Sequence, residues 1–333
     1  MSSENKQVIV ENREKIQTHP AKIGLAAYVD PKQVLTQRDH DQRWQHIFND
    51  WQDLACLEIQ YESDYLKNWW KNLPPMLQHY QSRVIVHGPT QKRDIASNNQ
   101  QLRSRSLAEN KKALDFAAEL GAEAMILHIT PQDDFDLRIK QLDRAIESFS
   151  ELASYIKDKS LPVSLMLENL EYPKWPADTK EAIDLLKYLK SIHPNLTSCV
   201  DLAHLWHNQA ALIPGTNYSQ DEFLNTLINY IVEVNYIAPI HRFHFAGAYL
   251  DRVNDIHQTH GAPNFNDVVN LNDASSLSKV IDVMPNNQSL SIINEFINFQ
   301  KNNGETVADI ILEMHIPQLE QKKQVALVQE YFK

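Results

Sequence analysis

Glycine is scarce in this chain, with seven glycines among 333 residues. Their spacing never forms the GxGxxG or GxxxxGK patterns with which dinucleotide-binding and P-loop proteins hold phosphate groups. The sequence therefore disfavours both kinds of nucleotide chemistry. Gly88, Gly247 and Gly261 each lie within three residues of a histidine. We expect the backbone to pass close to another group at these positions, because glycine has no side chain in the way.

Cysteine is scarcer still, since only Cys56 and Cys199 are present. Two thiols cannot supply a disulfide framework or a four-thiolate zinc site, and both lie in apolar runs, so we expect reduced core residues. Long hydrophobic runs are also missing: no stretch approaches the roughly 18 to 20 apolar residues of a membrane span. Residues 1–16 lack the apolar core of a secretory signal. We therefore expect a cytoplasmic protein with no membrane partner.

Basic residues are fewer than acidic ones, with 32 Lys and Arg against 43 Asp and Glu and a net charge of −11. This balance disfavours general binding to polyanions, although it leaves room for a local basic patch. With 43% hydrophobic and 23% charged residues, the composition is that of an ordinary globular protein. The chain is long enough to bury a sizeable core.

Short runs rich in Val, Ile and Leu alternate with longer segments of helical period, which indicates repeated βα units of an α/β protein. The predicted strands are Lys22–Ala27, Ala55–Ile59, Arg83–His87, Ala124–Ile129, Pro162–Glu168, Leu196–Asp201, Arg242–Ala246 and Asp309–Glu313. Between them, apolar residues recur at helical spacing before Gly121, and another helix is predicted over 286–303 before Gly304.

Eight consecutive βα units close most economically into a single (β/α)8 TIM barrel. We expect this barrel to span residues 22–333. The length that the barrel does not need falls in two places, a polar N-terminal arm at 1–21 and an Asn-rich insertion at about 263–287.

Ionisable side chains lie at the predicted C-terminal ends of the strands, where a barrel carries its active site. They are His87, His128, Glu168, Asp201, His204, His244 and Glu313, with Asp255 and His257 in the predicted loop after the seventh strand. A single histidine at a strand end is more often structural, but coincidence at six strand ends favours a shared site. Burial of so many charges is costly unless a cation neutralises the carboxylates.

Imidazole and carboxylate groups without thiolate suit zinc, manganese, iron or cobalt. Nine candidate ligands exceed what one ion can use. The sequence therefore predicts one to three divalent metal ions per chain.

These motifs resemble the xylose-isomerase-like TIM-barrel superfamily, which includes sugar and sugar-phosphate isomerases and epimerases and the apurinic-site endonucleases. The specific parts are AAELGAEAMILH, the LEN of strand five, the DxxH of strand six and the DxHxxxG after strand seven, and the similarity runs from IGLAAY at residue 23 to LEMH at 312. By this resemblance, one divalent ion is held by Glu168, Asp201, His244 and Glu313. In the endonucleases, residues matching His87 and His128 join Glu168 at a second ion, and those matching His204, Asp255 and His257 hold a third.

The resemblance implies an enzyme, and a sugar or sugar-phosphate isomerase or epimerase with a small-molecule substrate is the favoured interpretation. In that reaction a metal polarises a carbonyl group, Glu168 and Glu313 exchange a proton with the substrate, and His204 contacts a substrate oxygen. A second interpretation is a zinc-dependent phosphodiesterase of the apurinic-endonuclease type. HGPT after strand three, HFAGAY at strand seven and the lack of an aromatic-plus-Arg wedge loop disfavour a nucleic-acid partner.

A third interpretation is a multinuclear non-heme iron oxidase that modifies a cysteine-containing peptide. HFAG followed by DxH, and LEMHIP at strand eight, resemble that family, in which a partner protein presents the peptide. That family has Asn where this sequence has His204. A non-catalytic binding barrel is disfavoured because no predicted ligand position has been lost.

Overall fold

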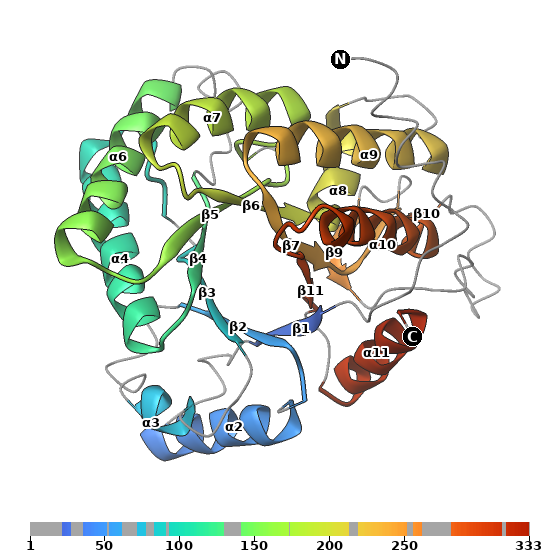
Figure 1. Cartoon of the computed structure of the whole chain (residues 1–333), viewed down its shortest axis with the longest axis horizontal. Helices are drawn as coiled ribbons and strands as arrows, with labels where there is room; N and C mark the ends of the chain where they lie inside the picture. Colours follow the sequence, from blue (N-terminus) through green and yellow to red (C-terminus); the bar gives the residue numbers. More distant parts are fainter. Residues whose placement is uncertain are drawn as a thin grey trace.

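Eight parallel strands close into a barrel in the order β1-β11-β7-β6-β5-β4-β3-β2, with helices around it (Figure 1). The computed structural model describes residues 22–27, 36–51, 53–61, 72–77, 83–90, 93–129, 141–172, 174–212, 219–251, 256–261, 281–314 and 318–332. The barrel strands are β1 (Lys22–Ala27), β2 (Cys56–Gln60), β3 (Arg83–His87), β4 (Ala124–Leu127), β5 (Ser164–Glu168), β6 (Thr197–Asp201), β7 (Ile240–Phe245) and β11 (Asp309–Leu312). Each overlaps one of the eight predicted strands, so the predicted (β/α)8 fold is confirmed.

The helices begin and end at local signals in the sequence. They are α2 (Gln37–Asp50), α3 (Leu73–Leu77), α4 (Gln100–Glu119), α6 (Leu142–Lys159), α7 (Thr179–Ile192), α8 (Leu202–Leu212), α9 (Gln220–Ile237), α10 (Asn286–Asn302) and α11 (Gln318–Tyr331). Asp178 and Glu181 form a reciprocal capping box at the start of α7, which satisfies backbone N–H groups that a helix leaves unpaired. Gly121 and Gly304 follow α4 and α10 with a φ of +68°, the left-handed conformation that ends helices. None of the described helices is long and apolar enough to span a membrane.

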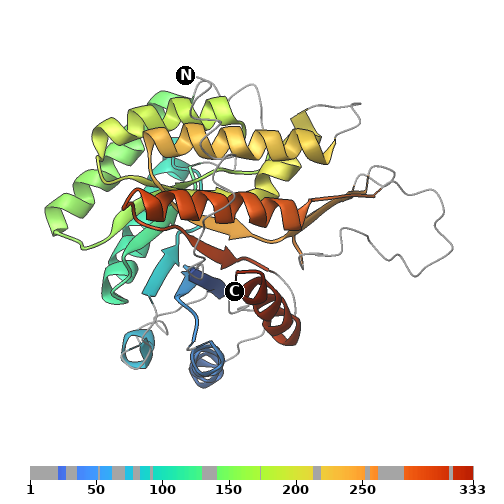
Figure 2. The ribbon, with the colours of Figure 1, turned by 45° about the vertical axis from the view of Figure 1, so that its right-hand side comes forward.

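A second, three-stranded antiparallel sheet follows β7, where the sequence predicted a loop. It consists of β8 (Gly247–Asp251), β9 (Ile256–Gly261) and β10 (Ile281–Val283) in the order β10-β8-β9. In Figure 2 its strands extend away from the barrel. The last residues of the predicted Asn-rich insertion form β10 and the start of α10. Residues 263–280 of that insertion and the predicted arm at 1–21 lie outside the described residues.

Alternation along the strands divides the core into an outer and an inner layer. On β7, Phe243 and Phe245 belong to the large apolar cluster between the strands and the helices. Arg242 instead points into the barrel, because it contacts Glu58 on β2 and strands β7 and β2 are not neighbours in the barrel. The inner apolar cluster is Cys56, Ile85, Ala124, Ile126, Met166, Cys199 and Ile311. Both cysteines are buried and unpaired with each other, as the sequence predicted.

Candidate metal centre

Most candidate ligands lie two residues after a member of the inner apolar cluster along the same strand. His87 follows Ile85 by two residues, and the same step separates Ile126 from His128 and Met166 from Glu168. Asp201 and Glu313 follow Cys199 and Ile311 in the same way. Since residues two apart on a strand share a face, these side chains enter the barrel interior at the C-terminal ends of the strands.

Four of the predicted ligands meet at one point. Glu168, Asp201, His244 and Glu313 each offer an atom, and these atoms lie within 4.8 Å of one another. Nδ1 of His244 lies 2.8 Å from Glu313 Oε2, 3.2 Å from Glu168 Oε1 and 3.8 Å from Asp201 Oδ2. Glu168, Asp201 and His244 are each about 1% exposed, so this group is almost fully removed from water.

The geometry around His244 is better satisfied by a cation than by a proton. One N–H at Nδ1 can make a good hydrogen bond to one acceptor, and the remaining carboxylates would face each other inside the protein at a large electrostatic cost. A divalent cation can bind the nitrogen lone pair and one oxygen from each carboxylate. One imidazole and three carboxylates form a donor set that suits manganese, iron, cobalt or zinc.

A second group shares Glu168 with the first. His87 and His128 direct Nε2 to the other oxygen of Glu168, Oε2, at 3.3 and 2.7 Å. Nδ1 of His87 donates a hydrogen bond of 3.0 Å to the carbonyl of Gly88, because a carbonyl can only accept, and Nε2 is therefore the nitrogen that faces Glu168. The two oxygens of Glu168 thus point to separate sets of ligands, an arrangement that would allow this carboxylate to bridge two ions.

The imidazoles and carboxylates shift one another's protonation in the metal-free protein. Burial alone would raise the pKa of Glu168, but His128 and His244 outweigh it and hold the pKa well below its usual value. Burial lowers the pKa of His87, yet the hydrogen bond and charge of Glu168 raise it to about 9. The pKa of His244 is raised well above its usual value, against burial, by the negative charges around it. At His128 burial prevails and lowers the pKa.

Local hydrogen bonds hold Asp201 and His204 in place at the end of β6. The Asn169 side chain accepts from the Asp201 N–H at 2.8 Å and donates to its carbonyl at 2.9 Å, which ties the ends of β5 and β6 together. Oδ1 of Asp201 accepts the backbone N–H of His204 at 2.7 Å and so caps the first turn of α8. Oδ2 of Asp201 is left facing Nδ1 of His244.

His204 lies beside the four-residue group rather than within it. Its Nδ1 donates a 2.9 Å hydrogen bond to the carbonyl of Asn169, and its Nε2 lies 3.5 Å from Glu171 Oε2. The predicted partners of His204 at a third ion cannot be placed, because Asp255 lies outside the described residues and the side chain of His257, on β9, is also not described. A third ion therefore stays a prediction.

The backbone approaches closely beside His87, as its neighbouring glycine led us to expect. A Cβ atom built on Gly88 would lie 2.6 Å from the carbonyl oxygen of Ile126. The Gly88 N–H donates to that same oxygen at 2.9 Å. Only glycine lets β3 and β4 continue pairing here, which keeps His87 and His128 side by side with ring centroids 4.8 Å apart.

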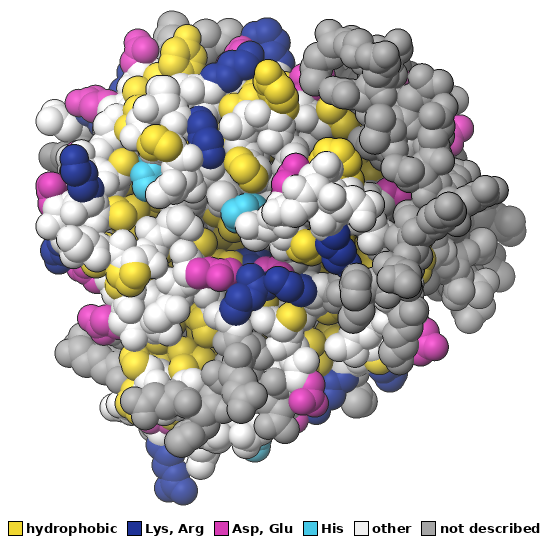
Figure 3. Space-filling view, in the orientation of Figure 1, with side chains coloured by type: hydrophobic (Ala, Val, Ile, Leu, Met, Phe, Trp, Pro, Cys, Tyr) yellow, Lys and Arg dark blue, Asp and Glu magenta, His cyan; other side chains and the backbone are white. Residues whose placement is uncertain are grey.

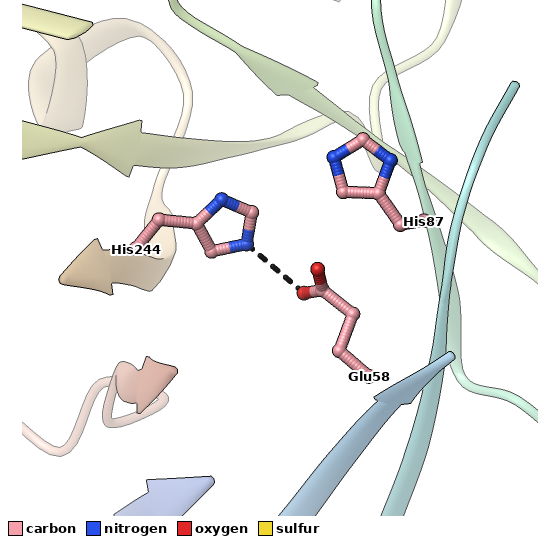
Figure 4. Close-up of side chains that lie close together, drawn as sticks. All are labelled: Glu58, His87 and His244. Atoms are coloured by element: carbon pink, nitrogen blue, oxygen red, sulfur yellow. Dashed lines mark hydrogen bonds and ion pairs between the residues drawn. The ribbon is translucent and has the colours of Figure 1, made fainter. Parts of the chain in front are cut away.

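One acidic residue at this site, Glu58, is not among the ligands predicted from the sequence. It is the third residue of β2, is 1% exposed, and its Oε2 accepts from Nε2 of His244 at 3.0 Å (Figure 4). A signal was present in the sequence CLEIQ, because strand alternation places the glutamate on the face opposite Leu57 and Ile59. The residue is in mid-strand rather than at a strand end, so a search of strand ends does not find it.

On the face of the molecule in Figure 3, basic side chains are separated by acidic and apolar ones over the described residues, and no side-chain type forms a large patch there.

The model of one protein family, described as xylose isomerase-like TIM barrel, matches residues 44–276 of the chain. That match covers well over half of the sequence. All the predicted ligands from His87 to His257 fall within it, and Glu313 lies beyond its end. A search of curated proteins finds no match to this sequence.

Several solved structures share the fold at low sequence identity. A D-tagatose 3-epimerase-like protein is 16% identical with a TM-score of 0.60, over 93% of this chain and 96% of that one. D-psicose 3-epimerase from Clostridium cellulolyticum, solved with D-tagatose, is 12% identical with a TM-score of 0.54, over 93% and 98%. The TTHB071 protein from Thermus thermophilus, soaked with zinc chloride, is 14% identical with a TM-score of 0.52, over 93% and 97%. At these identities the likeness extends to the fold alone.

Proposed function

Because the chain belongs to the xylose isomerase-like TIM-barrel family, we propose that it is a divalent-metal-dependent isomerase or epimerase of a sugar or sugar phosphate. The observation that carries this proposal is the convergence of Glu168, Asp201 and Glu313 on Nδ1 of His244. The D-tagatose 3-epimerase-like and D-psicose 3-epimerase structures supply the substrate class.

Glu168, Asp201, His244 and Glu313 would hold the ion. When bound, it would polarise a substrate carbonyl and the adjacent hydroxyl, and so lower the barrier to removing the proton from the neighbouring carbon.

Two carboxylates are placed to move that proton. Glu168 ends β5 and Glu313 follows β11, and β6 and β7 lie between these strands in the barrel. They therefore approach the site from different sides. One carboxylate takes the proton from carbon, and the other returns a proton to the opposite face for epimerisation or to the neighbouring carbon for isomerisation. His204 can accept a hydrogen bond from a substrate hydroxyl at Nε2, since its Nδ1 carries the hydrogen that it donates to Asn169.

Solvent exchange tests this proposal without knowledge of the exact sugar. Chelator-stripped protein is reloaded with Mn²⁺ or Co²⁺ and incubated in D2O with ketohexoses, ketopentoses and their phosphates. We expect deuterium at the carbon next to the carbonyl of at least one sugar, detected by NMR. Glu168→Gln and Glu313→Gln should each lose exchange, while Glu123→Gln, which removes an exposed carboxylate paired with Arg83, should retain it. Exchange that survives both site variants would contradict the assignment of the two bases.

The histidine pair favours a second candidate, a multinuclear metalloenzyme. An epimerase needs one ion, yet His87 and His128 form a further metal-capable group with Glu168. The iron oxidase and the phosphodiesterase of the sequence analysis would both use that group. Metal analysis of protein purified without chelator separates the candidates: about one manganese or cobalt per chain supports the epimerase, two or three irons the oxidase, and zinc the phosphodiesterase.

A further inference from the structure

We infer that Glu58 is a positioning residue of the metal centre, which fixes the imidazole of His244 so that Nδ1 is the nitrogen offered to the ion. The inference rests on the metal centre of the proposed function but not on its reaction.

The contact between Glu58 and His244 determines which ring nitrogen is available to an ion. Nε2 of His244 lies 3.0 Å from Oε2 of Glu58, and both side chains are 1% exposed. A carboxylate can only accept, so the hydrogen must be on Nε2. Nδ1 faces the three carboxylates, so it is the nitrogen whose lone pair an ion would take in place of a proton. Histidine ligands of metals commonly donate their second N–H to a carboxylate in this way, which orients the ring and raises its basicity.

A buried arginine lies beside Glu58. Nη1 of Arg242, whose side chain is fully buried, lies 3.5 Å from the same oxygen that accepts from His244. Its Nη2 lies 3.0 Å from Oδ2 of Asp309. Because a guanidinium does not lose its proton in proteins, Glu58 has a permanently positive neighbour inside the barrel.

Glu58, His87 and His244 could instead hold an ion of their own, since atoms of the three lie within 4.8 Å of one another. Figure 4 shows Glu58 pointing from β2 toward His244, with the His87 ring to one side. The Arg242 guanidinium opposes a second cation at this oxygen. The geometry therefore favours a hydrogen bond to His244, and metal stoichiometry distinguishes the two arrangements.

Metal affinity tests the inference independently of any sugar. Chelator-stripped wild-type, Glu58→Gln and Asp309→Asn proteins are titrated with Co²⁺ and Zn²⁺ against a chromophoric chelator. Loss of a carboxylate behind a histidine ligand weakens binding by about 10-fold to 100-fold, and we expect this for Glu58→Gln with unchanged stoichiometry. Asp309→Asn removes the other carboxylate from Arg242 without contacting His244, so its affinity should stay close to that of the wild type. The unfolding midpoints of the metal-free proteins show whether both variants fold.

A measurement on the wild-type chain avoids dependence on the variants. In the zinc-loaded protein, ring-nitrogen NMR of His244 should show a protonated Nε2 and an unprotonated Nδ1. Zinc bound at Nε2 would overturn the inference. So would a metal affinity of Glu58→Gln equal to that of the wild type, or an equal loss of affinity in Glu58→Gln and Asp309→Asn. The loss of one ion per chain in Glu58→Gln would also overturn it. If the wild type binds no ion, the proposed function fails as well. If it binds ions but exchanges no sugar proton, only the proposed reaction fails.

Discussion

The barrel interior buries charge in two regions, and β7 and β11, with the residue that follows β11, contribute to both. The arginine cluster lies in the N-terminal half of the barrel strands and consists of Cys56, Glu58, Arg242 and Asp309. The mouth cluster lies at the C-terminal ends of the strands and consists of His87, His128, Glu168, Asp201, His204, His244 and Glu313. On β7, one step of strand alternation separates Arg242 from His244, so a single strand contributes to both clusters.

The clusters differ in the source of their positive charge. In the arginine cluster a permanent guanidinium lies between the carboxylates of Glu58 and Asp309, and Arg83 also pairs with Asp309 from the edge. In the mouth cluster the positive charge comes from protons on imidazoles, which a metal ion can replace. Both regions bury charge to a similar degree. The positive charge is permanent in the arginine cluster, whereas in the mouth cluster a proton can be exchanged for a metal ion.

Removing the arginine should have the largest effect. Arg242→Met keeps most of the volume but leaves Glu58 without its arginine and Asp309 with Arg83 alone, and loss of one partner of a buried ion pair costs about 3 to 5 kcal/mol. We expect the free energy of unfolding, measured in urea, to fall by this amount. Lys180→Met, in an exposed pair with Asp184, should not change it measurably. A small loss in Arg242→Met would mean that the arginine cluster is not held by charge balance.

Adding a divalent ion should have the next largest effect, and it should act through the mouth cluster. At an ion concentration about 100 times the dissociation constant, binding to the folded state adds about 2.7 kcal/mol of stability. We expect Mn²⁺ or Co²⁺ to raise the urea midpoint of the wild type and of Asp309→Asn. Glu168→Gln should lose this gain, because it removes the carboxylate shared by both ligand groups. An equal gain in Glu168→Gln would place the ion elsewhere.

The pH dependence of stability should show a smaller effect, which arises in the mouth cluster. In the metal-free protein the pKa of His87 is raised from 6.5 to about 9, so the folded state binds more protons than the unfolded chain within that window. The stability that this imidazolium contributes is complete below pH 6.5 and is lost as the pH rises toward about 9. We expect urea midpoints in the presence of chelator to fall across this window. With Mn²⁺ bound, the ion replaces the protons and the fall should be smaller. A rise with pH in the metal-free protein would contradict this assignment.

The smallest effect should be the chemical reactivity of the two cysteines in the folded protein. Burial raises the pKa of the Cys56 thiol to about 11 and that of Cys199 to about 12, and thiolates rather than thiols react. We expect a small thiol reagent at about pH 8, near the pKa of a free thiol, to modify neither cysteine in the folded protein and both in urea. Rapid reaction of Cys56 would show that the arginine cluster is open to solvent, which would remove the contrast with the mouth cluster.

Strand prediction succeeded where the signal was local. Arg83–His87 was predicted with its observed bounds, and Glu168 and Asp201 were correctly placed at strand ends. The β8–β10 sheet was missed because β10 is three residues long and pairs with β8 across a long intervening segment. Short strands joined by distant pairing have little periodic pattern of their own.

The sequence by itself determined the eight strands, the inner and outer faces of each, and the imidazole and carboxylate groups at their ends, because alternation and residue chemistry are local properties. Only the tertiary structure decided that Glu58 meets His244 and that the two oxygens of Glu168 face different ligands. These contacts depend on how the closed barrel brings non-neighbouring strands within the reach of particular side chains. No pattern along one strand encodes that distance.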